Sequence, residues 1–388
     1  MRVLMISKAC IAGAYQRKLE EIAARGVDLT VAVPPYWRDD AGRRVPLERR
    51  HVDGYRLIET PMAFNGNFHV HFYPALARII RDVRPHLVHM DEEPYNVATA
   101  QALWLARASG ARTLFFTWQN LNRRYPLPFR LLERYAYAAT DGAIAGNRDA
   151  VDVLRAKGYT RRAWVIPQFG VDPALFTPSP SRDPARPFTV GWFSGRLHAF
   201  KGVHHLVEAV AALGGNARLE VLGWGPEEGN LRALATRLGL GDRFRIVPGV
   251  PSHEVPTFAR NLDVAVLPSL PTPRWKEQFG RMLIESMACG VAVVGSDSGE
   301  IPHLIGEAGL IFPTGDAMAL ADRLRQVRDD KTLREALVRR GTARVHAHFT
   351  QARIADATVA TYREVLGTPA SEGRQAHCNQ GVVGRGTN

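Results

Sequence analysis

Two carboxylates stand eight residues apart in the second half of the chain, on either side of a Phe-Gly step. Residues 277–290 read E-Q-F-G-R-M-L-I-E-S-M-A-C-G, so an apolar helix that begins near Gly280 leaves Glu277 in the entering loop and puts Glu285 on its second turn. Carboxylate oxygens accept paired hydrogen bonds from neighbouring hydroxyls, and the unpaired N–H groups of a helix N-terminus attract anions. This segment is therefore suited to a ligand that carries both hydroxyls and phosphates, as a sugar nucleotide does.

A second candidate for an anion site is the loop G-W-F-S-G-R-L-H-A-F-K-G at residues 191–202. It follows an apolar run and precedes a helical pattern, and Gly195 and Gly202 bracket its two cations, Arg196 and Lys201. Two fixed cations beside a helix start can neutralise a diphosphate leaving group without a metal ion. The alternative is a solvated loop with ordinary surface cations, because the P-loop pattern G-x-x-x-x-G-K-[ST] is absent.

Two loops in the first half are weaker candidates. The loop at residues 7–16 has one glycine, Gly13, which permits close approach of a ligand, but it lacks the G-x-G-x-x-G pattern, so a plain strand-to-helix turn is the default interpretation. A later strand-like run ends in Trp118, Gln119 and Asn120. Side chains at the end of such a strand predict contacts with a sugar or an acceptor.

The charge of the chain favours anionic partners. Lys and Arg outnumber Asp and Glu by 12, and the first 176 residues carry +8 of this excess. Such a field suits a nucleotide diphosphate, a phospholipid surface or nucleic acid; zinc-ligand spacings and RNP-like aromatic patterns are missing, so nucleic acid ranks last and is not expected as a partner. One basic and aromatic stretch is suited to an anionic membrane, although a helix entry with surface arginines explains it as well. It contains Arg123, Arg124, Tyr125, Phe129 and Arg130.

Cysteine and histidine spacing predicts no disulfide framework and no metal site. The three cysteines, Cys10, Cys289 and Cys378, lie far apart in the sequence and form no C-x-x-C pattern, which fits a reducing cytosol. The 13 histidines are dispersed along the chain. We therefore expect neither a metal nor a cofactor. No run approaches the ~20 apolar residues that cross a bilayer, and the opening M-R-V-L-M-I-S is too short for a signal-peptide core. We expect a cytoplasmic protein whose contact with the inner face of a membrane, if it has one, is peripheral.

Short apolar runs alternate with helical patterns along the chain, which predicts an α/β architecture with parallel sheets. The proline-rich segment 177–187 is a linker by composition. Two Rossmann-like halves joined by a hinge place a cleft between the carboxyl ends of their strands. We predict an N-terminal domain at 1–176, a C-terminal domain at 188–349, a further helix at 350–366 and a disordered tail at 367–388.

These motifs in combination resemble those of the retaining glycosyltransferases of family 4, the glycosyl transferases group 1. The resemblance extends over most of residues 1–366 and is strongest in the second half. Besides the segments above, it rests on I-P-Q-F-G-V-D-P-A-L-F (166–176), L-G-W-G-P (222–226), S-D-S-G-E-I-P (296–302) and G-E-A-G-L-I-F-P-T-G-D (306–316). It implies the GT-B fold, in which two Rossmann-like domains face each other across a cleft and the last helix packs back on the N-terminal domain.

The resemblance also implies residue roles. Glu277 is implied to contact the transferred sugar, with Arg196 and Lys201 as its catalytic companions at the diphosphate. Glu285 is implied to hold the ribose. The implied donor-binding residues are Gly13, Arg196, Lys201, Gly223, Phe279, Gly280 and Glu285. The chain departs from the family where Trp118 and its two neighbours stand in place of a common His.

The resemblance implies a metal-independent enzyme that transfers a hexosyl unit from a UDP-, GDP- or ADP-sugar to a hydroxyl group with retention of configuration. The acceptor is expected to be a glycan, a lipid or a small molecule in glycan, glycolipid or natural-product biosynthesis. Two alternatives stay open. One is a nucleotide-sugar epimerase or hydrolase of the same fold, and the other is an inactive, donor-binding regulatory partner.

Overall fold

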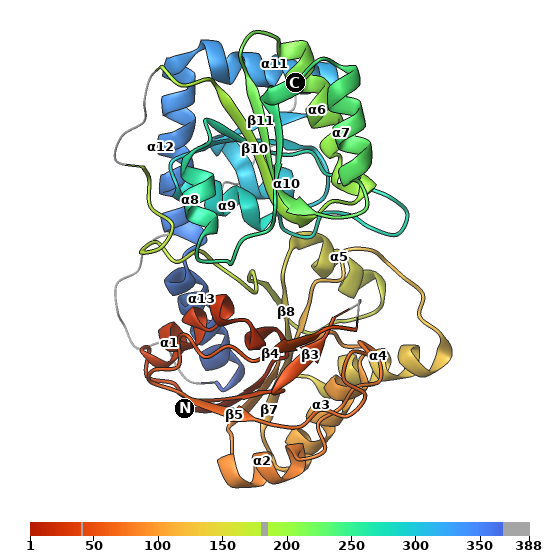
Figure 1. Ribbon diagram of the computed structural model, residues 1–388. Helices are drawn as coiled ribbons and strands as arrows, with labels where there is room; N and C mark the ends of the chain where they lie inside the picture. Colours follow the sequence, from red (N-terminus) through yellow and green to blue (C-terminus); the bar gives the residue numbers. More distant parts are fainter. Residues whose placement is uncertain (40–41, 180–184, 368–388) are drawn as a thin grey trace, which may run out of the picture.

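The computed structural model describes residues 1–39, 42–179 and 185–367 and arranges them as two α/β domains, one above the other in Figure 1. Each domain is built around a parallel sheet with helices on both faces. Most central strands are buried along nearly their whole length, which is why they read as short continuous apolar runs. The predicted α/β class and the two parallel sheets are confirmed.

The N-terminal domain has a seven-stranded sheet in the order β5-β2-β1-β6-β7-β8-β9. Its strands are β1 (Arg2–Ile6), β2 (Asp28–Val33), β5 (Arg56–Glu59), β6 (Leu87–Met90), β7 (Arg112–Thr117), β8 (Gly142–Ala145) and β9 (Ala163–Val165). Its helices are α1 (Arg17–Ala23), α2 (Leu76–Val83), α3 (Val97–Ala108), α4 (Leu127–Ala139) and α5 (Arg148–Ala156). A small antiparallel hairpin joins β3 (Tyr36–Arg38) to β4 (Arg44–Pro46).

The C-terminal domain has a six-stranded sheet in the order β12-β11-β10-β13-β14-β15. Its strands are β10 (Thr189–Arg196), β11 (Arg218–Trp224), β12 (Phe244–Val247), β13 (Val264–Leu267), β14 (Ala292–Ser296) and β15 (Leu310–Phe312). Its helices are α6 (Val203–Leu213), α7 (Glu228–Arg237), α8 (Val255–Arg260), α9 (Arg281–Ala288), α10 (Ile301–Ile305), α11 (Ala317–Asp329) and α12 (Lys331–His348). In both sheets the strand order reverses beside the first strand, and such a switch point opens a crevice at the carboxyl ends of the strands.

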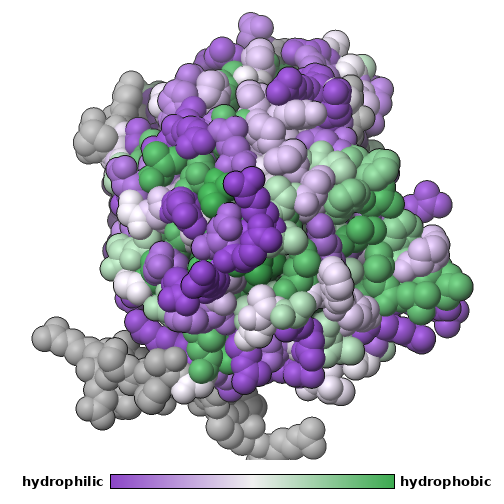
Figure 2. Space-filling model, turned by 90° about the horizontal axis from the view of Figure 1, so that it is seen from below, coloured by the Kyte–Doolittle hydropathy of each residue, from purple (hydrophilic) through white to green (hydrophobic). Residues whose placement is uncertain are grey.

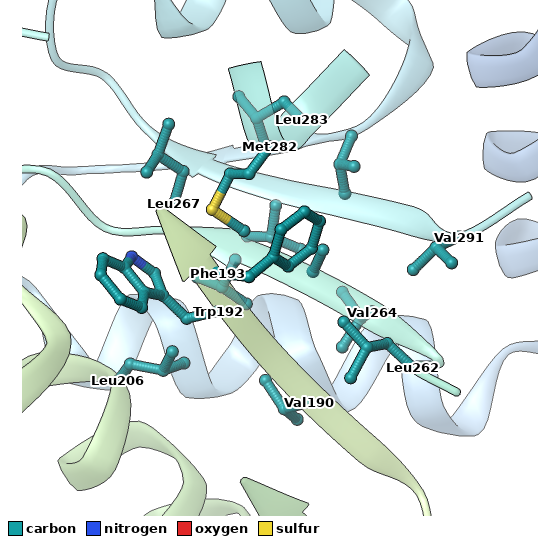
Figure 3. Close-up of a cluster of buried hydrophobic side chains, with 14 of the residues drawn as sticks. Val190, Trp192, Phe193, Leu206, Leu262, Val264, Leu267, Met282, Leu283 and Val291 are labelled. Atoms are coloured by element: carbon teal, nitrogen blue, oxygen red, sulfur yellow. The ribbon is translucent and has the colours of Figure 1, made fainter. Parts of the chain in front are cut away.

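The core of the C-terminal domain fixes the helix that carries the two-glutamate motif. Trp192 on β10 and Leu267 on β13 are fully buried, and Met282 and Leu283 of α9 pack into the same cluster (Figure 3). A close-packed core resists small shifts of its elements. The start of α9 is therefore held rigidly at the edge of the sheet.

The last helix returns to the N-terminal domain. The chain leaves α12 in the upper domain of Figure 1 and enters α13 (Gln351–Val365), which packs against α1 in the lower domain. The hydroxyl of Tyr362, which is fully buried, shares a 2.7 Å hydrogen bond with Nδ1 of His89 on β6. Of the predicted linker at 177–187, residues 180–184 lie outside the described residues, and so does the predicted tail apart from Gly367.

Candidate functional site

A cavity of about 500 Å³ lies between the carboxyl ends of the two sheets. The N-terminal domain lines it with Tyr15, Trp118 and Phe169, and the C-terminal domain lines it with the ends of β10 and β11, the loop after β12 and the start of α9. The volume is in the range of small-ligand sites, about 300–1,000 Å³. This cavity contains most of the residues predicted for the donor site.

A larger hollow of about 1090 Å³ lies elsewhere, on the outer side of the N-terminal domain. Its lining includes Arg2, His86 and Arg112, which stand at the amino ends of strands or just before them. Open parallel sheets bind ligands at the carboxyl ends of their strands. None of the sequence motifs reaches this hollow, so the cavity between the domains is the candidate site.

Glu277 is fixed at the border of this cavity by its side chain and by its backbone. Its buried Oε2 accepts hydrogen bonds from Nζ of Lys201 at 3.0 Å and from Oγ of Ser269 at 2.8 Å. Its carbonyl oxygen accepts the N–H of Glu300 at 3.3 Å. Gly299 has φ +60°, and a Cβ there would lie 2.1 Å from the same oxygen, so only glycine fits. The S-D-S-G-E-I-P segment therefore supports the loop that carries Glu277.

Helix α9 begins where the sequence predicted, directly after Gly280. This residue has φ +93°, and a Cβ there would lie 2.7 Å from Cδ2 of Leu267, so the position requires glycine. Phe279 and Gly280 both line the cavity. The N–H of Leu283 in the first turn of α9 donates to the carbonyl of Gly280 at 2.9 Å, whereas those of Arg281 and Met282 have no partner within the helix. The N-terminus of the helix gives this side of the cavity a partial positive charge.

Glu285 lines the cavity from the second turn of α9, where it pairs with a cation that sequence reasoning missed. Its Oε1 lies 3.0 Å from Nε of Arg281, and Nη1 of Arg281 donates to the Tyr15 hydroxyl at 2.8 Å. Burial raises the pKa of the Glu285 carboxyl above its usual value, and the positive charge of Arg281 opposes this rise. Arg281 stands between the two glutamates in the motif, so its charge was the available signal. Tyr15, which stacks on Phe169 at 3.8 Å, had none.

The two predicted loop cations lie beside the cavity and not in its wall. The guanidinium carbon of Arg196 lies 4.8 Å from the ring centroid of Trp224, which does line the cavity. Lys201 reaches the site through its ion pair with Glu277. Gly195 and Gly223 form the wall here. The loop therefore presents glycine backbone to a ligand and keeps its cations immediately behind.

Two residues of the N-terminal domain that were predicted to contact the ligand make hydrogen bonds within the protein. Gly13 does not line the cavity, because its N–H donates to Oε2 of Glu48 at 2.9 Å and the Arg50 side chain covers its Cα. Gln119 donates from Nε2 to the carbonyl of Leu121 within its own loop at 2.7 Å. The predictions that Gly13 approaches the donor phosphate and that Gln119 contacts a sugar are therefore not supported by this geometry.

Asn120 also departs from its predicted role, because it binds protein across the cleft. Its Nδ2 lies 3.2 Å from the carbonyl oxygens of Glu277 and of the residue before it. Gln278 donates back to the carbonyl of Trp118 at 2.9 Å, and Asn147 donates to the carbonyl of Gln278 at 2.9 Å. These three amides, Asn120, Asn147 and Gln278, form a cross-cleft clamp. Both domains therefore hold the backbone of the Glu277 loop.

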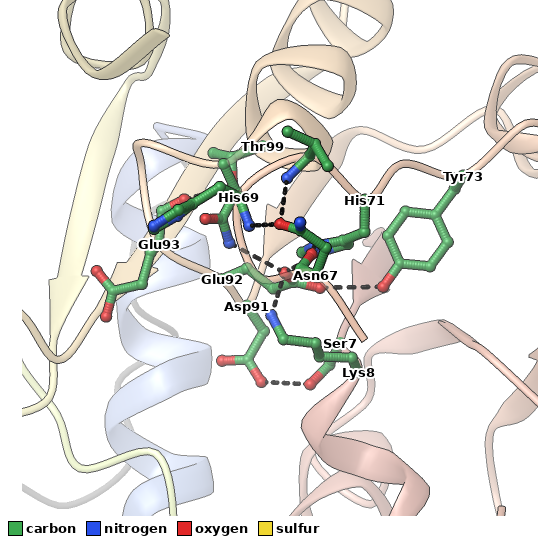
Figure 4. Close-up of polar contacts among 12 residues, drawn as sticks. Ser7, Lys8, Asn67, His69, His71, Tyr73, Asp91, Glu92, Glu93 and Thr99 are labelled. Atoms are coloured by element: carbon green, nitrogen blue, oxygen red, sulfur yellow. Dashed lines mark hydrogen bonds and ion pairs between the residues drawn. The ribbon is translucent and has the colours of Figure 1, made fainter. Parts of the chain in front are cut away.

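A buried ionic cluster lies at the carboxyl ends of β1 and β6 (Figure 4). The Glu92 carboxylate accepts hydrogen bonds from Nζ of Lys8, from Nε2 of His71 at 2.7 Å and from the Tyr73 hydroxyl at 3.0 Å. Burial acts to raise the pKa of Glu92, but the charges of Lys8 and His71 outweigh it and bring the pKa to about 2. The cluster ties the loop that contains His71 to the two central strands.

The neighbouring Glu93 titrates very differently. Its carboxylate accepts from Oγ1 of Thr117 at 2.6 Å and from the backbone N–H of Trp118 at 2.7 Å. Burial raises the pKa of Glu93 to about 7 despite these two hydrogen bonds, which favour the ionised form. A group that titrates near neutrality thus supports the Trp118 wall of the cavity. Sequence reasoning missed it, because a D-E-E run reads as solvated charge.

Comparison with known proteins agrees with this geometry. A family model described as "Glycosyl transferases group 1" matches residues 187–344, and one described as "Glycosyltransferase Family 4" matches residues 16–196. The chain belongs to the GT-B glycosyltransferases. The lipopolysaccharide core biosynthesis glycosyltransferase LpsE of Rhizobium meliloti is 28% identical over 342 residues, which are 87% of this chain and 90% of LpsE.

Other relatives match this GT-B glycosyltransferase over part of their length or in fold alone. WcaL of Escherichia coli, named for colanic acid biosynthesis, is 34% identical over 205 residues. These residues are 51% of this chain and 50% of WcaL, so the chain spans about half the length of that relative. The solved structure of Anabaena Alr3699/HepE in complex with UDP superposes with a TM-score of 0.74 at 20% identity, over 94% of this chain and 100% of HepE. That likeness confirms the GT-B fold.

Proposed function

We propose that this glycosyltransferase transfers a hexosyl unit from a nucleotide-sugar to an acceptor hydroxyl, with retention at the anomeric carbon. The observation that carries the proposal is the buried Glu277 carboxylate, which Lys201 and Ser269 fix beside the cavity and before the first turn of α9. A carboxylate suits the hydroxyls of a sugar ring. A helix N-terminus with Arg281 and Lys201 nearby suits the diphosphate.

The donor is proposed to lie with its ribose against Glu285 and its base towards the loop after β12. Both features line the cavity. Solved structures of Alr3699/HepE hold UDP and UDP-glucose, which supports UDP-sugars as the first donors to test. GDP- and ADP-sugars stay in the same panel.

The proposed mechanism uses the leaving phosphate as the base. The bond between the anomeric carbon and the phosphate oxygen breaks, and the departing oxygen takes the proton of the acceptor hydroxyl. The new glycosidic bond then forms on the face from which the diphosphate leaves. Lys201, Arg281 and the α9 N-terminus stabilise the charge that develops on the diphosphate. The cross-cleft clamp keeps the domains together, which excludes water from the reacting groups.

Metal and cofactor independence belong to the same proposal. In the part of the chain that the structure describes, no three His, Cys, Asp or Glu side chains are grouped to hold a metal ion. In the proposed mechanism Lys201 and Arg281 supply the positive charge that a metal ion would otherwise bring to the diphosphate. The names of LpsE and WcaL support a cell-envelope glycan or glycolipid as the acceptor, reached from the cytoplasmic side. No helix of the described residues is long and apolar enough to cross a membrane.

Thermal unfolding with UDP, GDP, ADP and TDP and with their sugars, all in EDTA, tests the proposal. A ligand at 100 times its Kd adds about 2.7 kcal/mol of stability. We expect one nucleotide to raise the Tm of the wild type and to raise it less in Lys201→Ala. Consumption of donor without an acceptor would instead identify an epimerase or hydrolase. Nucleotide binding without transfer to any acceptor would identify an inactive partner, and no shift at all would contradict donor binding.

A further inference from the structure

Helix α4 carries apolar side chains on its outer face as well as its inner one. Its inner face packs against the buried Leu103 of α3. Leu127, Leu131 and Tyr135 are 58%, 53% and 37% exposed. Steps of four residues keep these three side chains on one side of the helix. The outer side of α4 is therefore an apolar stripe with no protein covering it among the described residues.

Helix α3 widens this stripe. Trp104 is 63% exposed and follows Leu103, which packs on α4. One turn later, Arg107 donates to the carbonyl of Ala139 at the end of α4. Its positive charge opposes the rise that burial causes in the pKa of Tyr135, so the two side chains lie near each other. Figure 2 shows apolar side chains gathered on the right of the molecule, the side on which α3 and α4 lie in Figure 1, with hydrophilic residues among them. Trp and Tyr are the residues that favour a membrane–water interface.

The segment that carries α4, residues 121–139, is basic and has no exposed acid. Within residues 121–139 the acidic side chain is Glu133, which is buried and ion-paired with Lys157 at 2.6 Å. Arg124, Arg130 and Arg134 of this segment are exposed, whereas Arg123, which is also exposed, donates to the carbonyl of Arg274 in the C-terminal domain. An apolar stripe bordered by arginines, in a segment without an exposed acid, is complementary to anionic headgroups.

The structure also changes which residues of this stretch face outward. Tyr125 and Phe129, predicted as membrane contacts, turn inward around His69, whose ring centroid lies 6.1 Å and 4.8 Å from theirs. Tyr125 also packs on Tyr95 at 4.2 Å. The apolar side chains that face outward are Leu127, Leu131 and Tyr135, which lie on one side of α4.

We infer that this surface, named the α4 face and formed by Trp104, Leu127, Leu131, Tyr135 and the arginines Arg124, Arg130 and Arg134, docks on a bilayer that carries anionic headgroups. The apolar side chains enter the headgroup region, and the arginines reach lipid phosphates. A short loop joins α4 to Trp118 in the cavity wall, so a docked bilayer lies near the cleft. The inference goes beyond the proposed function, because docking requires neither donor nor transfer.

Sedimentation of the full chain with phosphatidylcholine vesicles, with and without phosphatidylglycerol, tests the inference. We expect binding to the anionic vesicles alone, weakened by salt. Leu131→Glu and Arg130→Glu should each lower the vesicle partition coefficient about tenfold or more. The matched controls are Leu238→Glu and Arg237→Glu at the end of α7, where Leu238 is 38% exposed and Arg237 is exposed. They should bind as the wild type does, and Tm values of all four variants verify folding.

Three results would overturn the inference. The first is equal binding to neutral and anionic vesicles, or no binding to either at low salt. The second is an equal loss of binding in the α4 and α7 variants. The third is a lipid-free dimer, detected by light scattering, that Leu131→Glu abolishes, because a second copy would then occupy the face. Vesicle binding by a chain without transferase activity would contradict the proposed function alone.

Discussion

Glu277 is held by contacts to its side chain and by contacts to its backbone. A substitution can therefore remove its charge and leave the backbone contacts in place. Lys201 and Ser269 hold the side chain, whereas Glu300 and Asn120 hold the backbone carbonyl. In Glu277→Gln the backbone contacts persist and the negative charge is lost. We expect kcat to fall by about 100-fold or more, with nucleotide affinity within a few-fold of wild type, as measured by steady-state kinetics and calorimetry.

The control for this variant is Glu307→Gln, since Glu307 is exposed and away from the cavity. It should leave both quantities unchanged. Transfer by Glu277→Gln at a rate near that of the wild type would remove Glu277 from the mechanism.

Glu93 makes a pH-dependent prediction. Its pKa rises from 4.5 to about 7 on folding, so between these values the folded state binds more protons than the unfolded state. Stability therefore falls as pH rises through this window. Gln in its place can still accept from the N–H of Trp118 and can donate to Thr117. We expect Glu93→Gln to gain stability relative to the wild type between pH 5 and pH 8, as measured by urea unfolding. If the difference in unfolding free energy between Glu93→Gln and the wild type is the same at pH 5 and at pH 8, the raised pKa of Glu93 is contradicted.

At the residue scale, local relations could be predicted and distant ones could not. The positions of Glu277, Gly280 and Glu285 follow from one helix start within nine residues, and the structure places all three at the cavity or its border. The Arg281–Tyr15 hydrogen bond joins residues 266 positions apart. No periodicity or spacing encodes such a contact. The same holds for Glu48, which occupies the N–H of Gly13 from 35 residues away.

The element that both domains hold is the loop from Lys276 to Gln278. Asn120 reaches two of its carbonyls from the opposite domain. Asn120→Ala removes these two hydrogen bonds and loosens the loop. The hydrogen bonds of Gln278 and Asn147 across the cleft remain. We expect kcat to fall about tenfold, the worth of one to two hydrogen bonds, and donor Kd to change less than twofold, because Glu285 and Gly223 are untouched.

Gln119→Ala is the matched control for the clamp. It removes a neighbouring amide whose hydrogen bond stays within its own loop, so its kcat should remain near that of the wild type. If both variants lose the same activity, the clamp does not position Glu277. A rise in donor Kd with unchanged kcat in Asn120→Ala would likewise contradict a positioning role.

Strands buried on both faces were predictable from their apolar runs, whereas three partly exposed strands of the N-terminal domain, β3, β4 and β5, were missed. Strands β1 and β14 were predicted, because nearly every residue in them is buried. The edge strand β5 and the β3–β4 hairpin have mostly exposed or half-buried residues. Their strand conformation comes from pairing with a neighbour, which composition does not reveal.

At the scale of the whole molecule, the return of α13 ties the chain beyond the C-terminal domain to the N-terminal sheet. Arg25 on the α1 side binds Asp356 at 2.6 Å and the carbonyl of Ala352 at 2.9 Å. The buried contact between Tyr362 and His89 lies beneath this exposed layer. Burial lowers the pKa of His89 to about 4, so at neutral pH the ring is uncharged and its Nδ1 shares the hydrogen bond with the Tyr362 hydroxyl.

Tyr362→Phe tests this attachment. The variant keeps the ring and leaves the buried Nδ1 of His89 without its hydrogen-bond partner, which costs about 1–3 kcal/mol. We expect the urea transition of the N-terminal domain to move to lower concentration, with nucleotide binding by the C-terminal domain unchanged. Tyr135→Phe, which removes a hydroxyl from a partly exposed ring, should shift neither. The folded pKa of His89 is below its unfolded value of 6.5, so His89 makes stability fall as pH drops from about 6.5 towards 4. Loss of nucleotide binding in Tyr362→Phe would instead show that α13 maintains the cleft itself.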